Sequence, residues 1–328
     1  MFQVVNISNL LNPFGKAFAE FEVEEELRGW GTKALVTGQH LLKLKKKEIR
    51  SLSVDNIANQ YCPTGRDTYI QKGNSRPKER IRKGAESTRG FPRNAGIIGE
   101  EFFVNILQAK GIKSDSYRKL QEVGDSYTSA FFKRKAVVLD QLKKDSPKDY
   151  DVFVSGLRLS GRVEFGIKHL YSVLTRNRTI RPSDILFDKE FMPTLQLGIS
   201  TPSKPDFVIP SLNLIGDVKS GESLEQKHLL TCAGYALAYE SSERKPIDWG
   251  MIYFFKAKNY TEYGKQISLP QVYLLPIDRE LREWFLEIRN ERYAIIMKDN
   301  MPELPSDTQK CNDCKYRSYC QKDGLVLQ

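Results

Sequence analysis

Two aspartates and a lysine flank a short predicted turn, and their spacing can bring them to one surface. Asp206 begins the apolar segment "DFVIP", while Asp217 and Lys219 end the segment "LNLIGDVKS". Both aspartates are equidistant from the centre of the turn "PSLN", so antiparallel pairing would put the two carboxylates opposite one another. Lys219 would project from the same face, because it lies two residues after Asp217.

Carboxylates in this arrangement suit Mg²⁺ or Mn²⁺, and a neighbouring lysine can orient an attacking water or stabilise charge on a phosphate. The pattern therefore predicts a metal-dependent hydrolase. The alternative is an exposed hairpin that carries only a surface salt bridge. The apolar character of "LNLIGDVKSG" favours the first interpretation, since charged groups at the end of a buried strand need partners.

Four of the five cysteines form a second candidate site. Cys311, Cys314 and Cys320 lie within "CNDCKYRSYC", and Cys62 lies 249 positions before the first of them (311 − 62). A zinc ribbon normally closes on two nearby cysteine pairs, so this spacing points to a centre that joins distant parts of the chain. An iron–sulfur cluster and a zinc ion both remain open. Cys232, in the apolar run "LLTCAGYALAY", is expected to be a core residue.

The surrounding pattern predicts an α/β fold with a mixed sheet flanked by helices. Helices are expected in the N-terminal region and over 94–111, 116–145, 223–242 and 278–299. Strands are expected from residue 151 onward, mixed with helical segments to about 190. The clearest predicted strands are 194–201, 206–210, 212–220, 249–258 and 267–277.

The charge is uneven along the chain. The formal net charge is +10, and residues 41–93 alone hold 14 Lys and Arg against 5 Asp and Glu. This density indicates contact with a polyanion such as nucleic acid, although a solvated loop has the same composition. The candidate DNA contacts are Arg66, Arg80, Arg82 and Lys83. With no long apolar run and no secretory signal, a cytoplasmic location without membrane contact is expected.

Pro205-Asp206 followed by Asp217-Val218-Lys219 resembles the PD-(D/E)XK nuclease signature. Two flanking helices are similar to those of the RecB branch. Tyr235 matches the tyrosine of a Gln-x-x-x-Tyr pair, with Thr231 in place of the glutamine. "GIIGEEFF" offers Glu100 in place of the usual histidine, with Glu101 as the second choice. His40, His169 and His228 do not fall at that position and are read as ordinary surface or core residues.

The resemblance implies that Glu100, Asp206, Asp217 and the Val218 carbonyl hold Mn²⁺ or Mg²⁺. It also implies that Lys219 and Tyr235 take part in catalysis. The cysteine order resembles the iron–sulfur nucleases of the same branch, in which one upstream and three C-terminal cysteines hold a [4Fe–4S] cluster. Here these would be Cys62, Cys311, Cys314 and Cys320.

Within that branch, "VEEELRGW" and "YCPTGRDTY" resemble the CRISPR-associated Cas-four family, more narrowly its archaeal subtype I-A variant. The resemblance implies a metal-dependent exonuclease that processes single-stranded DNA for new CRISPR spacers beside the integrase proteins. A non-catalytic iron–sulfur scaffold that binds DNA is the alternative. The expected organisation is an N-terminal helical and basic region (1–93), a RecB-like nuclease core (94–300) and a cluster-bearing C-terminal segment (301–328) packed on the N-terminal region.

Overall fold

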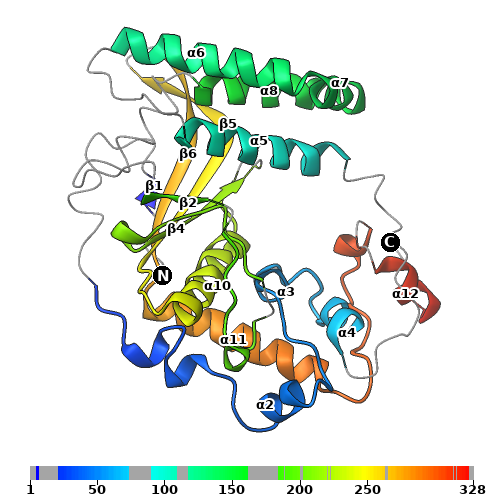
Figure 1. Ribbon diagram of the computed structural model, residues 1–328. Coiled ribbons are helices and arrows are strands. Elements are labelled where there is room, and N and C mark those ends of the chain that lie inside the picture. The colour runs from blue at the N-terminus through cyan, green and yellow to red at the C-terminus, as the bar shows by residue number, and fades with distance from the viewer. Residues whose placement is uncertain are drawn as a thin grey trace.

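The fold is known from a computed structural model (Figure 1). It describes residues 5–6, 21–73, 90–108, 117–161, 184–187, 189–199, 202–219, 221, 223–262, 265–312, 314 and 316–324. In this part of the chain, no helix combines the length and the apolar character that crossing a bilayer requires.

A six-stranded mixed sheet lies at the centre, with the strand order β1-β6-β5-β4-β3-β2. Only β4 and β5 pair in parallel, and every other neighbouring pair is antiparallel. The predicted α/β class with a mixed sheet is therefore confirmed. The strands are β1 (Val5–Asn6), β2 (Leu186–Phe187), β3 (Phe207–Ile209), β4 (Leu214–Lys219), β5 (Trp249–Glu262) and β6 (Lys265–Pro276).

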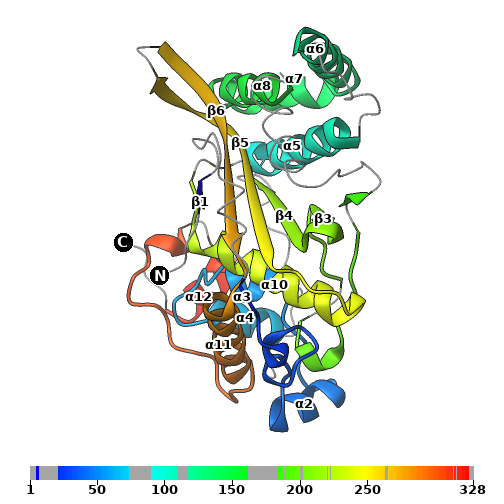
Figure 2. The same ribbon diagram turned by 90° about the vertical axis from the view of Figure 1, so that its left-hand side faces the viewer.

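Helices cover both faces of the sheet, as the two views show (Figures 1 and 2). One layer contains α5 (Gly90–Gln108), α6 (Tyr117–Arg134), α7 (Ala136–Asp145) and α8 (Pro147–Gly161). The other contains α2 (Gly38–Lys45), α3 (Val54–Ala58), α4 (Arg66–Lys72), α10 (Gln226–Glu243) and α11 (Arg279–Ile296).

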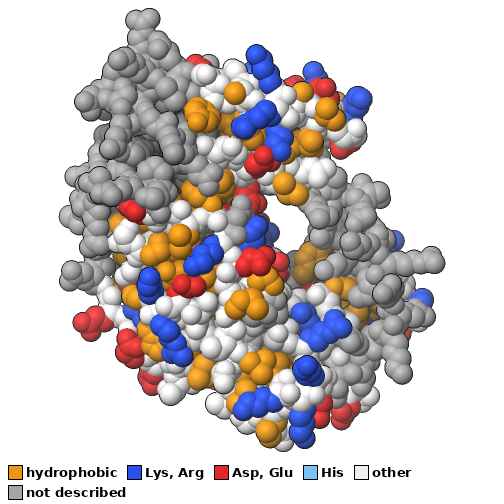
Figure 3. All heavy atoms as spheres, in the orientation of Figure 1, with side chains coloured by type: hydrophobic (Ala, Val, Ile, Leu, Met, Phe, Trp, Pro, Cys, Tyr) orange, Lys and Arg blue, Asp and Glu red, His pale blue; other side chains and the backbone are white. Residues whose placement is uncertain are grey.

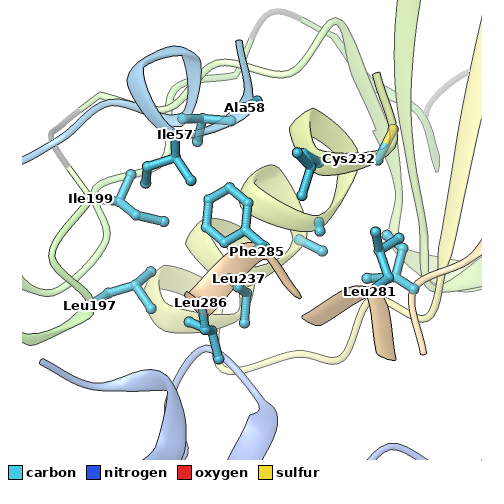
Figure 4. Packing of buried hydrophobic residues seen from close by; sticks show 14 of the residues in the cluster. Ile57, Ala58, Leu197, Ile199, Cys232, Leu237, Leu281, Phe285 and Leu286 are labelled. Atoms are coloured by element: carbon cyan, nitrogen blue, oxygen red, sulfur yellow. The ribbon is translucent and has the colours of Figure 1, made fainter. Parts of the chain in front are cut away.

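Alternation along the strands divides the core between these two layers. In β4, Leu214 and Val218 pack toward α5 and α8, whereas Ile215 packs toward α10 and α11. Asp217 and Lys219 share the parity of Ile215, so they face α10. Around α10 the core closes through apolar side chains of α3, α11 and the segment before β3; Figure 4 shows Ile57, Ala58, Leu197, Ile199, Cys232, Leu237, Leu281, Phe285 and Leu286.

Two predicted strand regions are wrong over the residues that the structure describes, namely 151–161 and 194–199; residues 162–183 and 200–201 lie outside them. Residues 147–161 form α8, whose apolar side chains Phe153, Val154 and Leu157 lie on a helix face that packs against α5, α7 and the sheet. In 194–201, a 3₁₀ helix (Leu195–Leu197) ends at Gly198, which has φ +73°. A left-handed residue breaks the extended conformation, so the alternating apolar pattern there serves the core without joining the sheet.

A buried ionic cluster holds the segment around Arg28 and Gly29 against α10. Glu240, which is fully buried on α10, accepts hydrogen bonds from Arg28 (2.9 Å) and from both terminal nitrogens of Arg282 (2.8 and 3.0 Å). The backbone N–H groups of Gly29 and Ile247 donate to the same carboxylate at 2.8 and 3.0 Å. Arg28 also donates to Asp248 at 2.6 Å, and Arg282 donates to backbone carbonyls, but Glu240 is the carboxylate that both arginines share. Removing its charge would leave the buried Arg282 without that counter-charge.

The C-terminal segment turns back onto α4. Its short helix α12 (Arg317–Lys322) brings Tyr316 and Cys320 against Ile70. The Tyr69 hydroxyl donates to the Asp299 carbonyl at 3.1 Å. Residues from the first quarter and the last tenth of the chain are thus neighbours beside α3 and α4 (Figure 1).

Candidate active site and thiol cavity

The β3–β4 hairpin has the register predicted from the sequence. Phe207 pairs with Gly216 and Ile209 with Leu214, and the same register continued by one residue sets Asp206 opposite Asp217. Gly216 permits this close pairing, because a Cβ at that position would lie 1.9 Å from the Phe207 ring. The turn is a 3₁₀ helix (Pro210–Leu212), followed by Asn213 in the left-handed region with φ +50°.

The two aspartates are bonded differently. Asp206 accepts a hydrogen bond from the backbone N–H of Val218 through Oδ2. Asp217 is 2% exposed, and its Oδ1 accepts from Lys219 Nζ at 2.6 Å. Its Oδ2 is buried with no hydrogen-bond partner among the described residues. A buried carboxylate oxygen without a donor is costly, so this atom marks a place where a cation would stabilise the protein.

The electrostatics of the site show an excess of negative charge. Burial raises the pKa of Asp206 well above its ordinary value, and the charges of Asp217 and Glu100 raise it further. Burial by itself would lower the pKa of Lys219, but the charges of Asp217 and Asp206 outweigh burial and raise it. The charges of Asp217 and Glu100 therefore both act on Asp206, with Lys219 as a partial counter-charge. A divalent cation would offset this excess of negative charge.

Helix α5 distinguishes the two glutamates that the sequence left open. Glu100 lies close enough to Asp206 for its charge to raise the pKa of that carboxyl. Glu101 points elsewhere, since its Oε2 pairs with Lys135 Nζ at 2.7 Å. In the described part of the chain, no group of three or more His, Cys, Asp or Glu side chains has the geometry to hold a metal ion as it stands. Glu100, Asp206 and Asp217 would have to draw together on binding one.

Helix α10 lines the other side of the site. Tyr235 is half-buried, and its pKa is raised by burial and by the charges of Asp217, Asp55 and Asp206. Thr231, one turn earlier, donates its hydroxyl to the Lys227 carbonyl at 2.7 Å. Because that hydroxyl group is bonded to the helix backbone, Thr231 does not extend toward the site as the longer glutamine of the RecB-like pattern would.

His228 is a neighbour of the site that sequence reasoning missed. Its Nδ1 accepts a hydrogen bond from the Glu225 N–H at 3.0 Å, and its ring meets Phe254 edge-on with the centroids 5.5 Å apart. Burial and the nearby charge of Lys219 lower its pKa to about 4. The available signal was helical spacing, because 228 and 235 lie seven residues apart on one face of α10.

The other predicted non-ligands have simpler surroundings. Cys232 is completely buried, which agrees with its expected place in the core, and burial raises the pKa of its thiol. His40 stacks on Tyr293 with ring centroids 5.5 Å apart. His169 lies outside the described residues.

The remaining four cysteines line one cavity, here called the thiol cavity. Cys62 comes from the loop before α4, and Cys311, Cys314 and Cys320 come from the C-terminal segment. All are free thiols, and the cavity between them has a free volume of about 20 Å³. The pKa of Cys311 is raised by burial and then by the charges of Cys314 and Cys62. The Tyr316 N–H donates to Cys314 Sγ at 3.4 Å, a bond that favours a thiolate.

Arg66 lies beside this cavity and not on an open surface. Its side chain is 5% exposed, and its guanidinium group donates to the Pro302 carbonyl and pairs with Asp323. Its positive charge lowers the pKa of the Cys320 thiol against the larger effect of burial. Arg66 is therefore occupied inside the protein, contrary to its predicted contact with DNA. The other predicted DNA contacts, Arg80, Arg82 and Lys83, lie outside the described residues.

Comparison with known proteins gives two matches. A family model described as CRISPR-associated exonuclease Csa1 matches residues 1–93 and 172–323. A CRISPR-associated exonuclease Csa1 of Saccharolobus solfataricus is 26% identical over 303 residues, which cover 91% of this chain and 92% of the relative. No solved structure matches the chain.

Proposed function

Because the chain belongs to the Csa1 family of CRISPR-associated exonucleases, we propose that it is a metal-dependent deoxyribonuclease whose catalytic centre is built on the β3–β4 hairpin. One observation carries the proposal. Asp217 is buried beside Asp206 and Lys219, and one of its carboxylate oxygens has no donor among the residues that the structure describes. In a purely structural salt bridge we expect both carboxylate oxygens to have donors, whereas a metal ligand needs one oxygen that is available to the cation.

The chemistry of the donor set fits a hard divalent cation. Glu100, Asp206, Asp217 and the Val218 carbonyl would hold Mn²⁺ or Mg²⁺, since these ions prefer oxygen ligands. When bound, such an ion polarises a phosphodiester and lowers the pKa of a water. Relief of the repulsion that raises the pKa of Asp206 supports binding at this point.

The remaining residues act on substrate and water. Lys219, held 2.6 Å from Asp217, would orient the attacking water or donate to the phosphate oxygen that gains charge. Tyr235, on the facing helix, would donate a hydrogen bond from its hydroxyl group to the scissile phosphate. Its pKa is raised, so it stays protonated at neutral pH. No step needs either group to change its covalent state.

We further propose single-stranded DNA as the preferred substrate and the acquisition of CRISPR spacers, beside the integrase proteins, as the cellular role. The support is the name of the family together with the strongly basic composition of residues 41–93. Charge-based phosphate contacts bind DNA without reading its sequence, which suits trimming of unrelated fragments.

The thiol cavity would hold a [4Fe–4S] cluster in this proposal. Four thiols line one cavity. Among the described residues, however, no three potential ligands lie close enough together to bind a single metal ion. A zinc ion needs all its sulfur ligands about 2.3 Å from one point, whereas each iron of a cluster takes its own thiolate. Zinc is the second candidate, favoured by the small free volume of about 20 Å³. Either centre would fasten the C-terminal segment to the loop before α4.

One experiment tests the proposed activity. End-labelled single-stranded DNA is incubated with wild type and with Asp217→Ala, in Mn²⁺, in Mg²⁺ and in EDTA. Progressive shortening by wild type in either metal, with none in EDTA and none by the variant, is expected. DNA binding without cleavage by wild type in both metals would instead support the non-catalytic scaffold.

A further inference from the structure

A second, polar cavity lies between α3, α4, α10 and the C-terminal segment. Its volume is about 380 Å³, within the usual range of small-ligand sites. Amide side chains dominate its wall, namely Asn56, Asn59, Gln60 and Gln71, together with the carboxylates Asp55 and Asp67. Neither the catalytic hairpin nor the thiol cavity accounts for this concentration of amides.

The polar cavity adjoins both sites already described. Cys314 and Tyr316 belong to its wall and to that of the thiol cavity. On the opposite side, its wall includes Lys227, whose carbonyl accepts from Thr231 one turn before Tyr235. Asp55 lies near enough to Tyr235 to raise the pKa of that phenol. A ligand in the cavity would therefore sit next to the catalytic face of α10.

The wall chemistry excludes a phosphate as the main ligand. Asp67 pairs with Arg292 at 4.0 Å, and the one ammonium group of the wall, Lys227, pairs with Glu225 at 3.0 Å. The charge of Asp55 therefore makes the wall negative, and the cavity repels anions. The amides offer both donors and acceptors, and Tyr61 and Tyr316 contribute aromatic rings. A flat heterocycle with mixed hydrogen-bonding edges fits this wall, and a nucleobase of single-stranded DNA has those properties.

We propose that the polar cavity receives one base of the DNA strand whose phosphate lies at Asp206, Asp217 and Lys219. The proposal rests on the nuclease function above and adds base recognition to it. Carboxylates only accept hydrogen bonds, so Asp55 favours bases that carry an exocyclic amine. Cytosine, adenine and guanine have such an amine, and thymine has a carbonyl oxygen in its place. The cavity should therefore discriminate against thymine.

The test compares the binding of the full-length protein to dC and dT oligonucleotides of twelve nucleotides, in EDTA and at fixed salt, by fluorescence anisotropy. The two pyrimidines are of similar size and differ at the exocyclic position. Wild type should bind the dC strand about ten-fold more tightly, the discrimination expected of one good base contact. Asp55→Asn should bring the two affinities within about two-fold, because an amide can also donate to thymine.

Asn59→Ala gives a second variant at the cavity wall, and it should also reduce the ratio. Both residues are exposed, so these substitutions are compatible with folding. Asp140→Asn, an exposed carboxylate on α7, is the matched control and should keep the wild-type ratio. Equal wild-type affinities for the two strands, or a ratio unchanged in both cavity variants, would overturn the inference. If wild type cleaves both strands in Mn²⁺ with such a result, base recognition fails while the nuclease function stands; absence of any cleavage would count against the function itself.

Discussion

Lys219 Nζ lies 2.6 Å from Asp217 Oδ1, although only one residue separates the two on β4. The pair is asymmetric, because Asp217 is buried while about a third of the Lys219 side chain is exposed. Lys219 thus donates to one oxygen of a carboxylate whose second oxygen has no hydrogen-bond partner in the described part of the chain. The same ammonium group would serve both catalysis and the native state.

Replacing the lysine should therefore lower stability as well as activity. Lys219→Met leaves a buried, unpaired carboxylate, a change that costs about 3 kcal/mol. The double variant Asp217→Asn with Lys219→Met should recover most of that stability and none of the activity. Thermal unfolding of the metal-free protein and DNA cleavage in Mn²⁺ measure the two effects. Equal melting temperatures for Lys219→Met and wild type would show that the pair contributes nothing to folding.

The thiol cavity predicts that a distant cysteine matters as much as a near one. Cys62→Ser should remove the bound metal as fully as Cys314→Ser, since both line the same cavity. Cys232→Ala is the control and should keep the metal, because that thiol lies in the core beside α10. Iron, sulfide and zinc are measured on protein purified without oxygen. About four irons per chain is expected for a [4Fe–4S] cluster. Stoichiometric zinc without iron would show that the cavity binds a zinc ion and not a cluster.

His228 should make the protein sensitive to mild acid. Its pKa is about 4 in the folded protein and about 6.5 in the unfolded chain. The unfolded chain therefore binds the proton first, and stability is lost as pH falls from about 6.5 to 4. The loss is at most about 3 kcal/mol.

His228→Asn keeps an acceptor near the position of Nδ1, where the Glu225 N–H donates, but it cannot be protonated in this range. Urea unfolding at pH 7 and pH 5 gives the comparison. The variant should lose less stability than wild type between these two pH values. An identical loss in both proteins would assign the acid sensitivity to other groups.

Glu240 should be among the most sensitive positions in the molecule. Glu240→Gln weakens the bonds to Arg28 and Arg282 and leaves their charges buried, at a cost of about 3–5 kcal/mol. Glu243→Gln, three residues later, is the control. Its partner Lys189 is 3.5 Å away at the surface, so its loss should cost less than about 1 kcal/mol. Denaturant unfolding curves give the free energy of unfolding of each variant. Similar losses for Glu240→Gln and Glu243→Gln would contradict the prediction.

Arg66 should hold the C-terminal segment in place. Arg66→Ala removes the bonds to Pro302 and Asp323. Limited chymotrypsin digestion, whose sites Tyr316 and Tyr319 are the same in both variants, should then cut the segment between residues 301 and 324 faster than in wild type. Arg317→Ala is the matched control, because that exposed arginine also lines the thiol cavity but donates to the carbonyl of Asn312, five residues earlier in the same segment. Equal cutting rates in the two variants would remove the special role of Arg66.

The β3–β4 hairpin was predictable because two local rules determine its pairing. Side chains alternate along a strand, and the length of the turn sets the register, so the pairing of 206 with 217 follows from the sequence alone. The choice between Glu100 and Glu101 was not predictable, because it depends on a tertiary contact: Glu101 pairs with Lys135, just before α7. The same holds for Arg66. A basic residue in a basic segment reads as a surface group until the C-terminal segment is seen to cover it.

Misread elements have a common physical cause. The residues of α8 are rich in β-branched and aromatic side chains, which favour strands. Their apolar residues have helical spacing, however, and a helix buries them against α5, α7 and the sheet. The segment 194–201 alternates as a strand would, yet Gly198 takes a positive φ and Tyr293 packs where a Cβ would lie. Tertiary contacts overrode local propensity in both cases.

The thiol cavity joins residues that leave the ribosome far apart in time. Synthesis of the 249 positions between Cys62 and Cys311 (311 − 62) takes roughly 12 to 50 seconds at 5–20 residues per second. Throughout that interval, Cys62 exists without the other three thiols that share its cavity. A centre held by all four thiols could therefore assemble only after the C-terminal segment has been synthesised.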